Sequence, residues 1–335
     1  MATTNNRLGC LTIFLFVALC ASIVINIMLG FASLGRLGGT ARLNEPMPRF
    51  REVVVERGGK TTGPKVALIP LRGIISSGVS GTLGESMVDD LRYALDQAAQ
   101  DDDVRAIVLE IDSPGGEVTA SDVIYNAVVR ARAKKPVVVY MNSLAASGGY
   151  YVACGGRFLM ANDTTITGSI GVIIQTLNYE QLLNKVGLAA VVFKSGKFKD
   201  MLNGARPITE EERAYVQGFV MGTYEKFLGI VATERNLPAD SLRETVADGR
   251  ILSGRDALEN KLIDGLGQLE DAYQKAKELG NAPNATVVKY RPPFTFGRLF
   301  QAFGQTEKIE LTLPKQLMPQ LESGRAYYLP SYYAP

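Results

Sequence analysis

Two glycine-rich turns, each directly after an apolar run, contain the residues best suited to chemistry. The first turn ends at Gly115–Gly116, and the second contains Ser147 and Gly148. In a parallel α/β sheet, ligands bind at the carboxyl ends of strands. Acyl transfer needs a nucleophile and two N–H donors for the developing oxyanion. Ser147 can supply the hydroxyl, Gly148 one amide and the Gly115–Gly116 turn the other, although a serine before a helix is also an ordinary N-cap.

The chain contains no histidine, so a base that activates Ser147 must be of another type. A Ser-His-Asp triad and a His-ligated metal site are therefore excluded. The three cysteines are too few and too scattered for a zinc cluster or a disulfide framework. A Ser-Lys dyad solves the same problem, provided that the lysine is neutral when it acts. Neutrality near pH 7 requires the lysine pKa to fall from ~10.4 towards 7–8, normally through burial.

Three lysines, Lys194, Lys197 and Lys199, follow the apolar run 189–193. The run predicts a buried strand, which would lead a lysine out of the protein interior rather than off a solvated face. Spacing alone does not distinguish the three candidates.

The rest of the sequence alternates β-rich and helical runs. Several of the β-rich runs are continuous stretches of Val, Ile and Leu, as is typical of strands covered on both faces. Thr209, with Glu212 three residues later, forms a capping box that predicts the start of a long helix. This alternation favours an α/β domain with a largely parallel sheet. The predicted strands are 66–75, 105–112, 135–141, 157–161, 165–174 and 189–193, and the predicted helices are 84–100, 118–133, 179–186 and 209–235.

Composition and charge limit the classes of partner. Hydrophobic residues make up 46% of the 335 residues and charged residues 21%, which is ordinary for a globular protein. The formal net charge is +2, and residues 1–42 carry three arginines and no acid, which leaves 33 basic and 34 acidic groups in the remainder. A nearly neutral main part gives no electrostatic reason to expect a nucleic-acid partner.

Residues 8–34 run for 27 positions without a charge. As a helix this segment would be ~40 Å long against a hydrocarbon core of ~30 Å, so it predicts a transmembrane anchor. A cleaved signal peptide is the alternative, but its apolar region should be only ~7–15 residues long. Residues 1–7 are then a short tail and 35–64 a linker rich in Gly, Pro and charge. Flanking arginines leave the orientation open, because long domains translocate largely regardless of charge.

Six motifs in order resemble the bacterial signal peptide peptidase A family, in its short form with a single catalytic domain. The resemblance covers residues 65 to about 280, within a predicted protease domain over 65–291. The scattered aromatics and prolines of 292–335 predict a C-terminal tail. The motifs are Asp-Ser-Pro-Gly-Gly (112–116), Ala-Ala-Ser-Gly-Gly-Tyr-Tyr (145–151), Thr-Gly-Ser-Ile-Gly-Val (167–172), Ser-Gly-Lys-Phe-Lys-Asp (195–200), Asp-Gly-Arg-Ile-Leu-Ser-Gly-Arg (248–255) and Leu-Ile-Asp-Gly-Leu-Gly (262–267).

The resemblance implies a crotonase/Clp-protease-like fold of repeated ββα units and a Ser-Lys serine endopeptidase. It implies that Ser147 is the nucleophile, Lys199 the general base and Ser169 the residue that holds the lysine amine. Gly148 and the Gly115–Gly116 turn would form the oxyanion hole, with the second donor undecided between the two glycines. No metal and no cofactor is implied.

The resemblance also implies partners and a location. The substrates would be peptides, namely remnant signal peptides and other apolar segments. A ring-shaped homo-oligomer is implied, in which Lys199 can come from the adjacent subunit. The expected location is the bacterial cytoplasmic (inner) membrane, with a single pass through the N-terminal helix and an extracytoplasmic catalytic domain.

Three other functions remain open from the sequence. A related membrane-tethered Ser-Lys protease could act on another membrane protein. The same fold also occurs in crotonase-like enzymes that are not peptidases, and a catalytically silent membrane scaffold would need no chemistry. A serine-directed covalent probe separates the last two from a peptidase, because neither needs an activated serine.

Overall fold

A computed structural model of the chain describes seven residues between 15 and 26, and residues 50–59, 63–78, 86–292 and 327–328. The chain divides into two compact units, residues 1–47 and 48–335. In the first unit the seven described residues are helical. Within the described residues, no helix has both the length and the apolar character needed to cross a membrane. Most of the anchor expected at 8–34, most of the expected tail at 292–335, and residues 35–49 and 60–62 of the expected linker lie outside the described residues.

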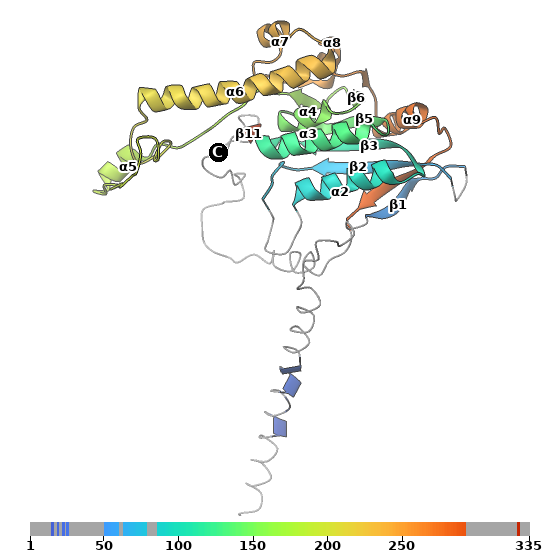
Figure 1. Ribbon diagram of the computed structural model, residues 1–335, viewed down its shortest axis with the longest axis horizontal. Coiled ribbons are helices and arrows are strands. Elements are labelled where there is room, and N and C mark those ends of the chain that lie inside the picture. The colour runs from blue at the N-terminus through green and yellow to red at the C-terminus, as the bar shows by residue number, and fades with distance from the viewer. Residues whose placement is uncertain are drawn as a thin grey trace, which may run out of the picture. The chain divides into compact units, whose positions relative to one another are not determined.

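The second unit is built on one sheet whose central strands are parallel (Figure 1). The antiparallel strand β1 (Arg51–Glu56) forms one edge, paired with β10. From β10 to β9 every neighbouring pair is parallel. The strands in spatial order after β1 are β10 (Thr286–Arg291), β2 (Lys65–Arg72), β3 (Val104–Ser113), β5 (Val137–Ala145), β6 (Phe158–Ala161) and β9 (Gly265–Leu266). The predicted α/β class with a parallel core is confirmed.

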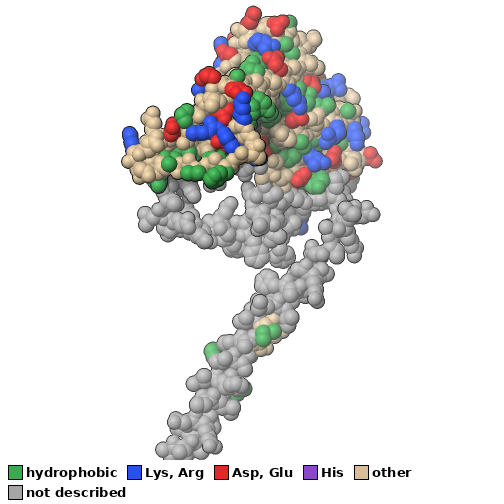
Figure 2. Space-filling model, turned by 60° about the vertical axis from the view of Figure 1, so that its left-hand side comes forward, with side chains coloured by type: hydrophobic (Ala, Val, Ile, Leu, Met, Phe, Trp, Pro, Cys, Tyr) green, Lys and Arg blue, Asp and Glu red, His purple; other side chains and the backbone are tan. Residues whose placement is uncertain are grey.

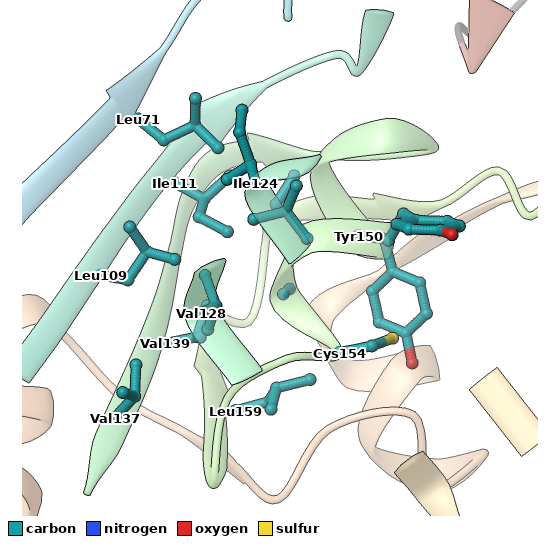
Figure 3. Close-up of a cluster of buried hydrophobic side chains, with 14 of the residues drawn as sticks. Leu71, Leu109, Ile111, Ile124, Val128, Val137, Val139, Tyr150, Cys154 and Leu159 are labelled. Atoms are coloured by element: carbon teal, nitrogen blue, oxygen red, sulfur yellow. The ribbon is translucent and has the colours of Figure 1, made fainter. Parts of the chain in front are cut away.

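Alternate residues of the central strands enter two separate apolar cores, one on each face of the sheet. In β3, Ile107 and Leu109 belong to the larger core, whereas Val108 belongs to the smaller one. Helices α2 (Met87–Gln100), α3 (Val118–Arg132) and α4 (Gly148–Ala153) cover the larger core, and α9 (Leu269–Leu279) covers the smaller. Figure 3 shows side chains of β3, β5, α3 and α4 meeting in the larger core. Burial on both faces explains why these strands are continuously apolar.

A short second layer lies beyond the carboxyl end of β5. Strand β7 (Ile166–Gly168) pairs with Leu144 of β5 and, antiparallel, with β8 (Ile251–Ser253). The predicted strand 165–174 is therefore much shorter than expected. A capping box at Ser253 begins α8 (Gly254–Glu259) directly after β8, which fixes how the chain leaves this layer.

Helix α6 (Glu210–Arg235) begins at the predicted capping box and ends at Asn236, which is in the left-handed conformation. Its carboxyl half contributes Phe227, Leu228 and Val231 to the larger core. Its first turns extend beyond the sheet, where Glu212 is the one residue of that half that is buried. Helix α7 (Ala239–Thr245) follows it.

Residues 171–208, here called the arm, project from the sheet and contain α5 (Glu180–Lys185) (Figure 1). Between 171 and 203 no residue is buried. The prediction of a buried strand at 189–193 is wrong, because this segment is an exposed irregular stretch in which the Phe193 side chain is 95% exposed. The segment is apolar as its composition indicates, but within the described part of this single chain no element packs against it.

Candidate active site

Ser147 lies at the carboxyl end of β5, where the chain turns sharply into α4. Its backbone has φ 53° and ψ −116°, a conformation that a residue with a Cβ adopts only under strain. Its N–H donates to the carbonyl oxygen of Gly168 at 2.9 Å. The side chain is completely buried, and its Oγ has no hydrogen-bond partner among the residues that the structure describes. A strained strand-to-helix turn that presents an unpaired hydroxyl is the geometry of a nucleophile elbow.

The two glycine-rich turns lie against each other, as the sequence predicted. A Cβ placed on Gly148 would lie 3.1 Å from the Cα of Gly115 and 3.1 Å from the backbone nitrogen of Gly116. The Gly115 N–H already donates to Ser113 Oγ at 3.1 Å. The structure thus brings Ser147, Gly148 and the Gly115–Gly116 turn together at the carboxyl ends of β3 and β5.

Strand β4 (Gly116–Glu117) has neighbours on both edges. Glu117 N–H donates to the Ile75 carbonyl oxygen at 2.8 Å, and Ile75 N–H donates to the Gly115 carbonyl oxygen at 2.7 Å. Successive backbone groups of a strand point to opposite edges, so those of Gly116 point away from Ile75. At that other edge lies β11 (Tyr327–Tyr328), antiparallel, with Tyr328 opposite Gly116 and Tyr327 opposite Glu117.

The carboxylate of Glu117 fixes the segment that follows β2. It accepts hydrogen bonds from Ser76 Oγ at 2.9 Å, from Ser77 N–H at 3.2 Å and from Ser77 Oγ. This carboxylate and the β4–β11 pairing were not foreseen from the sequence. The only signal for the pairing was the tyrosine-rich composition of the last residues, which indicates no particular partner.

Ser169 follows Gly168, the residue whose carbonyl holds Ser147. It is buried, has φ 51°, and its N–H donates to the carbonyl oxygen of Arg250 at 2.7 Å. Thr167, two residues earlier, donates its hydroxyl to the Ala145 carbonyl oxygen at 2.7 Å. Ser169 therefore lies on a segment that is bonded to Ala145 and to Ser147 itself.

Lys199 lies in the arm, on a turn closed by its N–H to the carbonyl oxygen of Gly196 at 3.1 Å. Its side chain is exposed and makes no hydrogen bond or ion pair within residues 86–292. The structure does not bring Lys199 to Ser147 within one chain, since the Ser147 hydroxyl has no described partner.

The two alternative lysines are both engaged. Lys194 Nζ lies 2.7 Å from Asp200 Oδ1, and Lys197 Nζ lies 2.5 Å from Glu211 Oε1. Of the three candidates, Lys199 alone has an amine without such a partner in the described structure.

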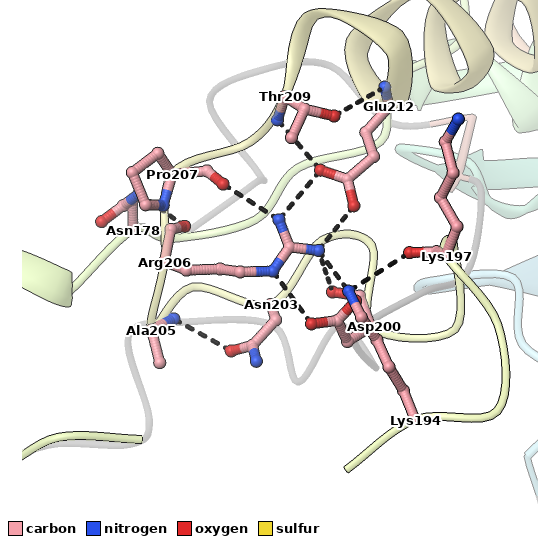
Figure 4. Close-up of polar contacts among 10 residues, drawn as sticks. All are labelled: Asn178, Lys194, Lys197, Asp200, Asn203, Ala205, Arg206, Pro207, Thr209 and Glu212. Atoms are coloured by element: carbon pink, nitrogen blue, oxygen red, sulfur yellow. Dashed lines mark hydrogen bonds and ion pairs between the residues drawn. The ribbon is translucent and has the colours of Figure 1, made fainter. Parts of the chain in front are cut away.

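Asp200, the residue after Lys199, is held by an ionic cluster at the start of α6 (Figure 4). Arg206 donates to both carboxylate oxygens of Asp200 at 2.9 Å, and to Glu212 Oε2 at 2.9 Å and Oε1 at 2.5 Å. The Arg206 guanidinium, followed by Lys194, lowers the pKa of Asp200 well below its usual range. The same guanidinium and the N–H of Thr209 lower the pKa of Glu212 to about 2. Arg206 was not foreseen from the sequence, because it lies six residues from each acid, and residues that share a helix face are three or four apart.

No three His, Cys, Asp or Glu side chains of the described residues gather as a metal site would require. Cys154 is buried next to Tyr150 in the larger core, and burial raises the pKa of its thiol to about 12. A thiol in that environment is inert as a nucleophile.

The model of peptidase family S49 matches residues 130–282, and the Clp protease model matches residues 72–169. The putative signal peptide peptidase SppA of Enterococcus faecium is 36% identical over 246 residues, covering 72% of this chain and 70% of the relative. A putative protease of Synechocystis sp. is 40% identical over 221 residues, covering 65% and 76%. Protease 4 of Salmonella typhi is 34% identical over 219 residues, but the match covers only 35% of that longer protein.

Proposed function

Because the chain belongs to peptidase family S49 and is a serine endopeptidase, we propose that its catalytic dyad is Ser147 of one subunit and Lys199 of a neighbouring subunit. The observation that carries this proposal is the buried Ser147 hydroxyl, without a described partner, on a strained turn beside glycine amides. Lys199 is the candidate lysine without a carboxylate partner among the described residues, and it stands on the exposed arm.

In the proposed reaction, neutral Lys199 accepts the proton of Ser147 Oγ as that oxygen bonds to the peptide carbonyl carbon. The protonated lysine then donates to the leaving amine as the carbon–nitrogen bond breaks, which leaves an acyl-enzyme. A water molecule, deprotonated by the same lysine, attacks the ester carbonyl, and Ser147 leaves with the returned proton. Ser169, on the segment bonded to the Ser147 turn, would hold the lysine amine.

We assign the oxyanion hole to the N–H groups of Gly148 and Gly116. The Gly115 N–H is occupied by Ser113 Oγ, whereas the backbone groups of Gly116 point away from Ile75 and lie close to Gly148. Two N–H donors beside the nucleophile are the arrangement that stabilises a tetrahedral oxyanion.

The arm supports a closed ring of identical subunits. Isolated proteins rarely expose many large apolar side chains in one region. In the arm such side chains are exposed by 60% or more, and Figure 2 shows hydrophobic side chains gathered on the projecting part of the molecule. Packing this segment on a second copy would bury them and carry Lys199 to the neighbour. The residues exposed to this degree are Leu177, Leu182, Val186, Leu188, Val191 and Phe193.

We propose that peptides bind as an added strand on the edge of β4 that faces away from Ile75, in the place that β11 occupies. The pairing of β11 with Gly116–Glu117 supports this, since it places an extended segment antiparallel to the proposed oxyanion strand. Backbone pairing of this kind accepts many sequences, while pockets select alternate side chains. Remnant signal peptides and other apolar segments are the proposed substrates, with a cleavage site in another membrane protein as the second candidate.

We further propose that residues 8–34 anchor the enzyme in the bacterial inner membrane, with the catalytic domain outside the cytoplasm. The support is the run of 27 uncharged residues, together with a substrate class that is produced at that membrane. Protease protection in spheroplasts tests it: added protease should digest the catalytic domain in intact spheroplasts, and protection would place the domain inside.

The dyad is tested by fluorophosphonate labelling of the full-length protein in detergent. Wild type should label, and Ser147→Ala and Lys199→Ala should not, with unchanged circular dichroism. Mixing the two inactive variants before reassembly should restore about one quarter of wild-type sites in a ring of randomly mixed subunits. No recovery between subunits that demonstrably exchange would contradict the shared dyad, and an unlabelled, folded wild type would contradict the peptidase mechanism.

A further inference from the structure

We propose that Arg206 is a positioning residue for Lys199: it fixes the lysine-bearing turn to α6 and keeps the adjacent carboxylate of Asp200 away from the lysine amine. The inference rests on the proposed role of Lys199 as the base. It concerns a side chain that does not touch the reacting atoms in this scheme.

Both chain neighbours of Lys199 are tied to α6. The Phe198 ring stacks on that of Tyr215, with centroids 5.3 Å apart and the planes 25° from parallel. Asp200 is bonded through Arg206 to Glu212 in the first turn. With the residues before and after it anchored to the same helix, the Lys199 backbone has a defined place even though no residue between 171 and 203 is buried. The backbone position of Lys199 is thereby fixed relative to α6.

The Arg206 guanidinium is well suited to this role. It is planar and offers donors in a fixed fork, so one side chain can bridge two carboxylates at once. Besides the four contacts with Asp200 and Glu212, it donates to the backbone carbonyl oxygens of Asp200 at 3.1 Å and Pro207 at 3.0 Å. The side chains of Asp200 and Glu212 are only 10% and 4% exposed, although they lie at the base of an exposed arm.

The charges around Lys199 are paired with one another rather than with the lysine. Asp200 is paired with Arg206 and Lys194, Glu212 with Arg206, and Glu211 with Lys197. Tyr215 is a further titratable group on α6, and its ring faces Phe198; Glu210 and Arg213 of the same helix pair with each other. A free carboxylate beside a lysine favours the charged amine, which cannot act as a base. By pairing with Asp200, Arg206 keeps the carboxylate next to Lys199 in the chain from holding the lysine protonated.

The test compares Arg206→Ala, Arg206→Lys and the double variant Arg206→Ala/Asp200→Asn in the full-length protein. The readout is the pH profile of kcat/KM for a fluorogenic apolar peptide, with assembly checked by native mass spectrometry. Arg206→Ala should shift the acid limb of the profile upward by about one pH unit, a roughly tenfold loss near neutrality. Adding Asp200→Asn should return the limb to its wild-type position. The acid limb of Arg206→Lys should lie between those of wild type and Arg206→Ala, because an ammonium cannot make the forked contact.

The matched control is Arg213→Ala. Arg213 is also on α6, is exposed, and pairs only with the exposed Glu210 at 3.4 Å among the described residues, so its removal should change kcat/KM less than twofold. If Arg206→Ala does not assemble, the same comparison of acid limbs can be made between Arg206→Lys and the double variant Arg206→Lys/Asp200→Asn. A wild-type acid limb in an assembled Arg206 variant, or a shifted limb that Asp200→Asn leaves in place, would overturn the proposal. Full activity of Lys199→Ala would instead overturn the proposed dyad itself, which keeps the two failures distinct.

Discussion

Ser147 and Gly168 are joined by a backbone hydrogen bond of 2.9 Å, from the serine N–H to the glycine carbonyl oxygen, and this bond accompanies a serine conformation of φ 53° and ψ −116°. The strain is located at the residue that carries the hydroxyl and not at its glycine neighbours. Strained backbone persists where the surrounding structure over-determines it, often at catalytic positions. Here β5, α4 and the 165–169 segment together supply that constraint.

Replacing Ser147 by glycine should therefore stabilise the fold relative to replacing it by alanine. Glycine adopts this conformation without the steric cost, which is about 1–3 kcal/mol for other residues, but it loses more chain entropy on folding. We expect Ser147→Gly to exceed Ser147→Ala in unfolding free energy by about 1 kcal/mol, measured by urea denaturation. Both variants should be inactive. Equal stabilities would mean that the turn is relaxed in solution.

A charge on the apolar surface of the arm should prevent assembly without unfolding the subunit. Phe193, 95% exposed, contributes nothing to the core, so Phe193→Asp should leave the thermal transition of the core unchanged. We expect a shift from oligomer to monomer in sedimentation velocity and a loss of at least about tenfold in activity, because a charge in an apolar interface is costly to bury. Leu258→Asp on α8, outside the arm and 36% exposed, is the matched control and should keep both properties. An intact, active Phe193→Asp oligomer would exclude this surface as the interface.

Removing residues 322–335 should strengthen peptide binding. β11 occupies the edge of β4 that the proposed substrates use, and a tethered segment competes at an effective concentration of roughly millimolar. Steady-state kinetics should show a lower KM with kcat nearly unchanged. A synthetic peptide of residues 322–335 should inhibit the truncated enzyme competitively, and a scrambled peptide should not. A KM that does not change on truncation would show that this pairing does not compete with substrate.

The ionic cluster should make the arm sensitive to acid. Arg206 lowers the folded-state pKa of Glu212 from 4.5 to about 2. A carboxylate with a depressed folded pKa stabilises the folded state fully above its unfolded pKa and loses that contribution as the pH falls through the folded value. The arm should thus loosen between pH 4.5 and about 2, seen as faster amide exchange in residues 194–212 after correction for intrinsic rates. Glu212→Gln should flatten this pH dependence, whereas Glu210→Gln, on an exposed residue of the same turn, should not.

The Ser147 turn and the Gly115–Gly116 turn could both be located from the sequence, because each follows a run of buried strand residues. Parallel strands end at the same edge of the sheet, so the two turns could meet there, and the pairing of β3 with β5 brings them together. The lysine is harder to place. The apolar run 189–193 predicts a buried strand, yet it is exposed, since apolar composition indicates burial but does not say whether the burying partner is the same chain.

Local pattern by itself determined the parallel α/β core and the capping box that starts α6, and it indicated Ser147 as a candidate site without histidine. Each depends on residues close in sequence or on strand order. Only the tertiary structure decided the exposure of Lys199 on a projecting arm, the Arg206 cluster beneath it, and the pairing of β11 with β4. These contacts join residues whose spacing in the sequence does not predict that they meet. They form only when the folded chain brings their donors and acceptors within hydrogen-bonding distance.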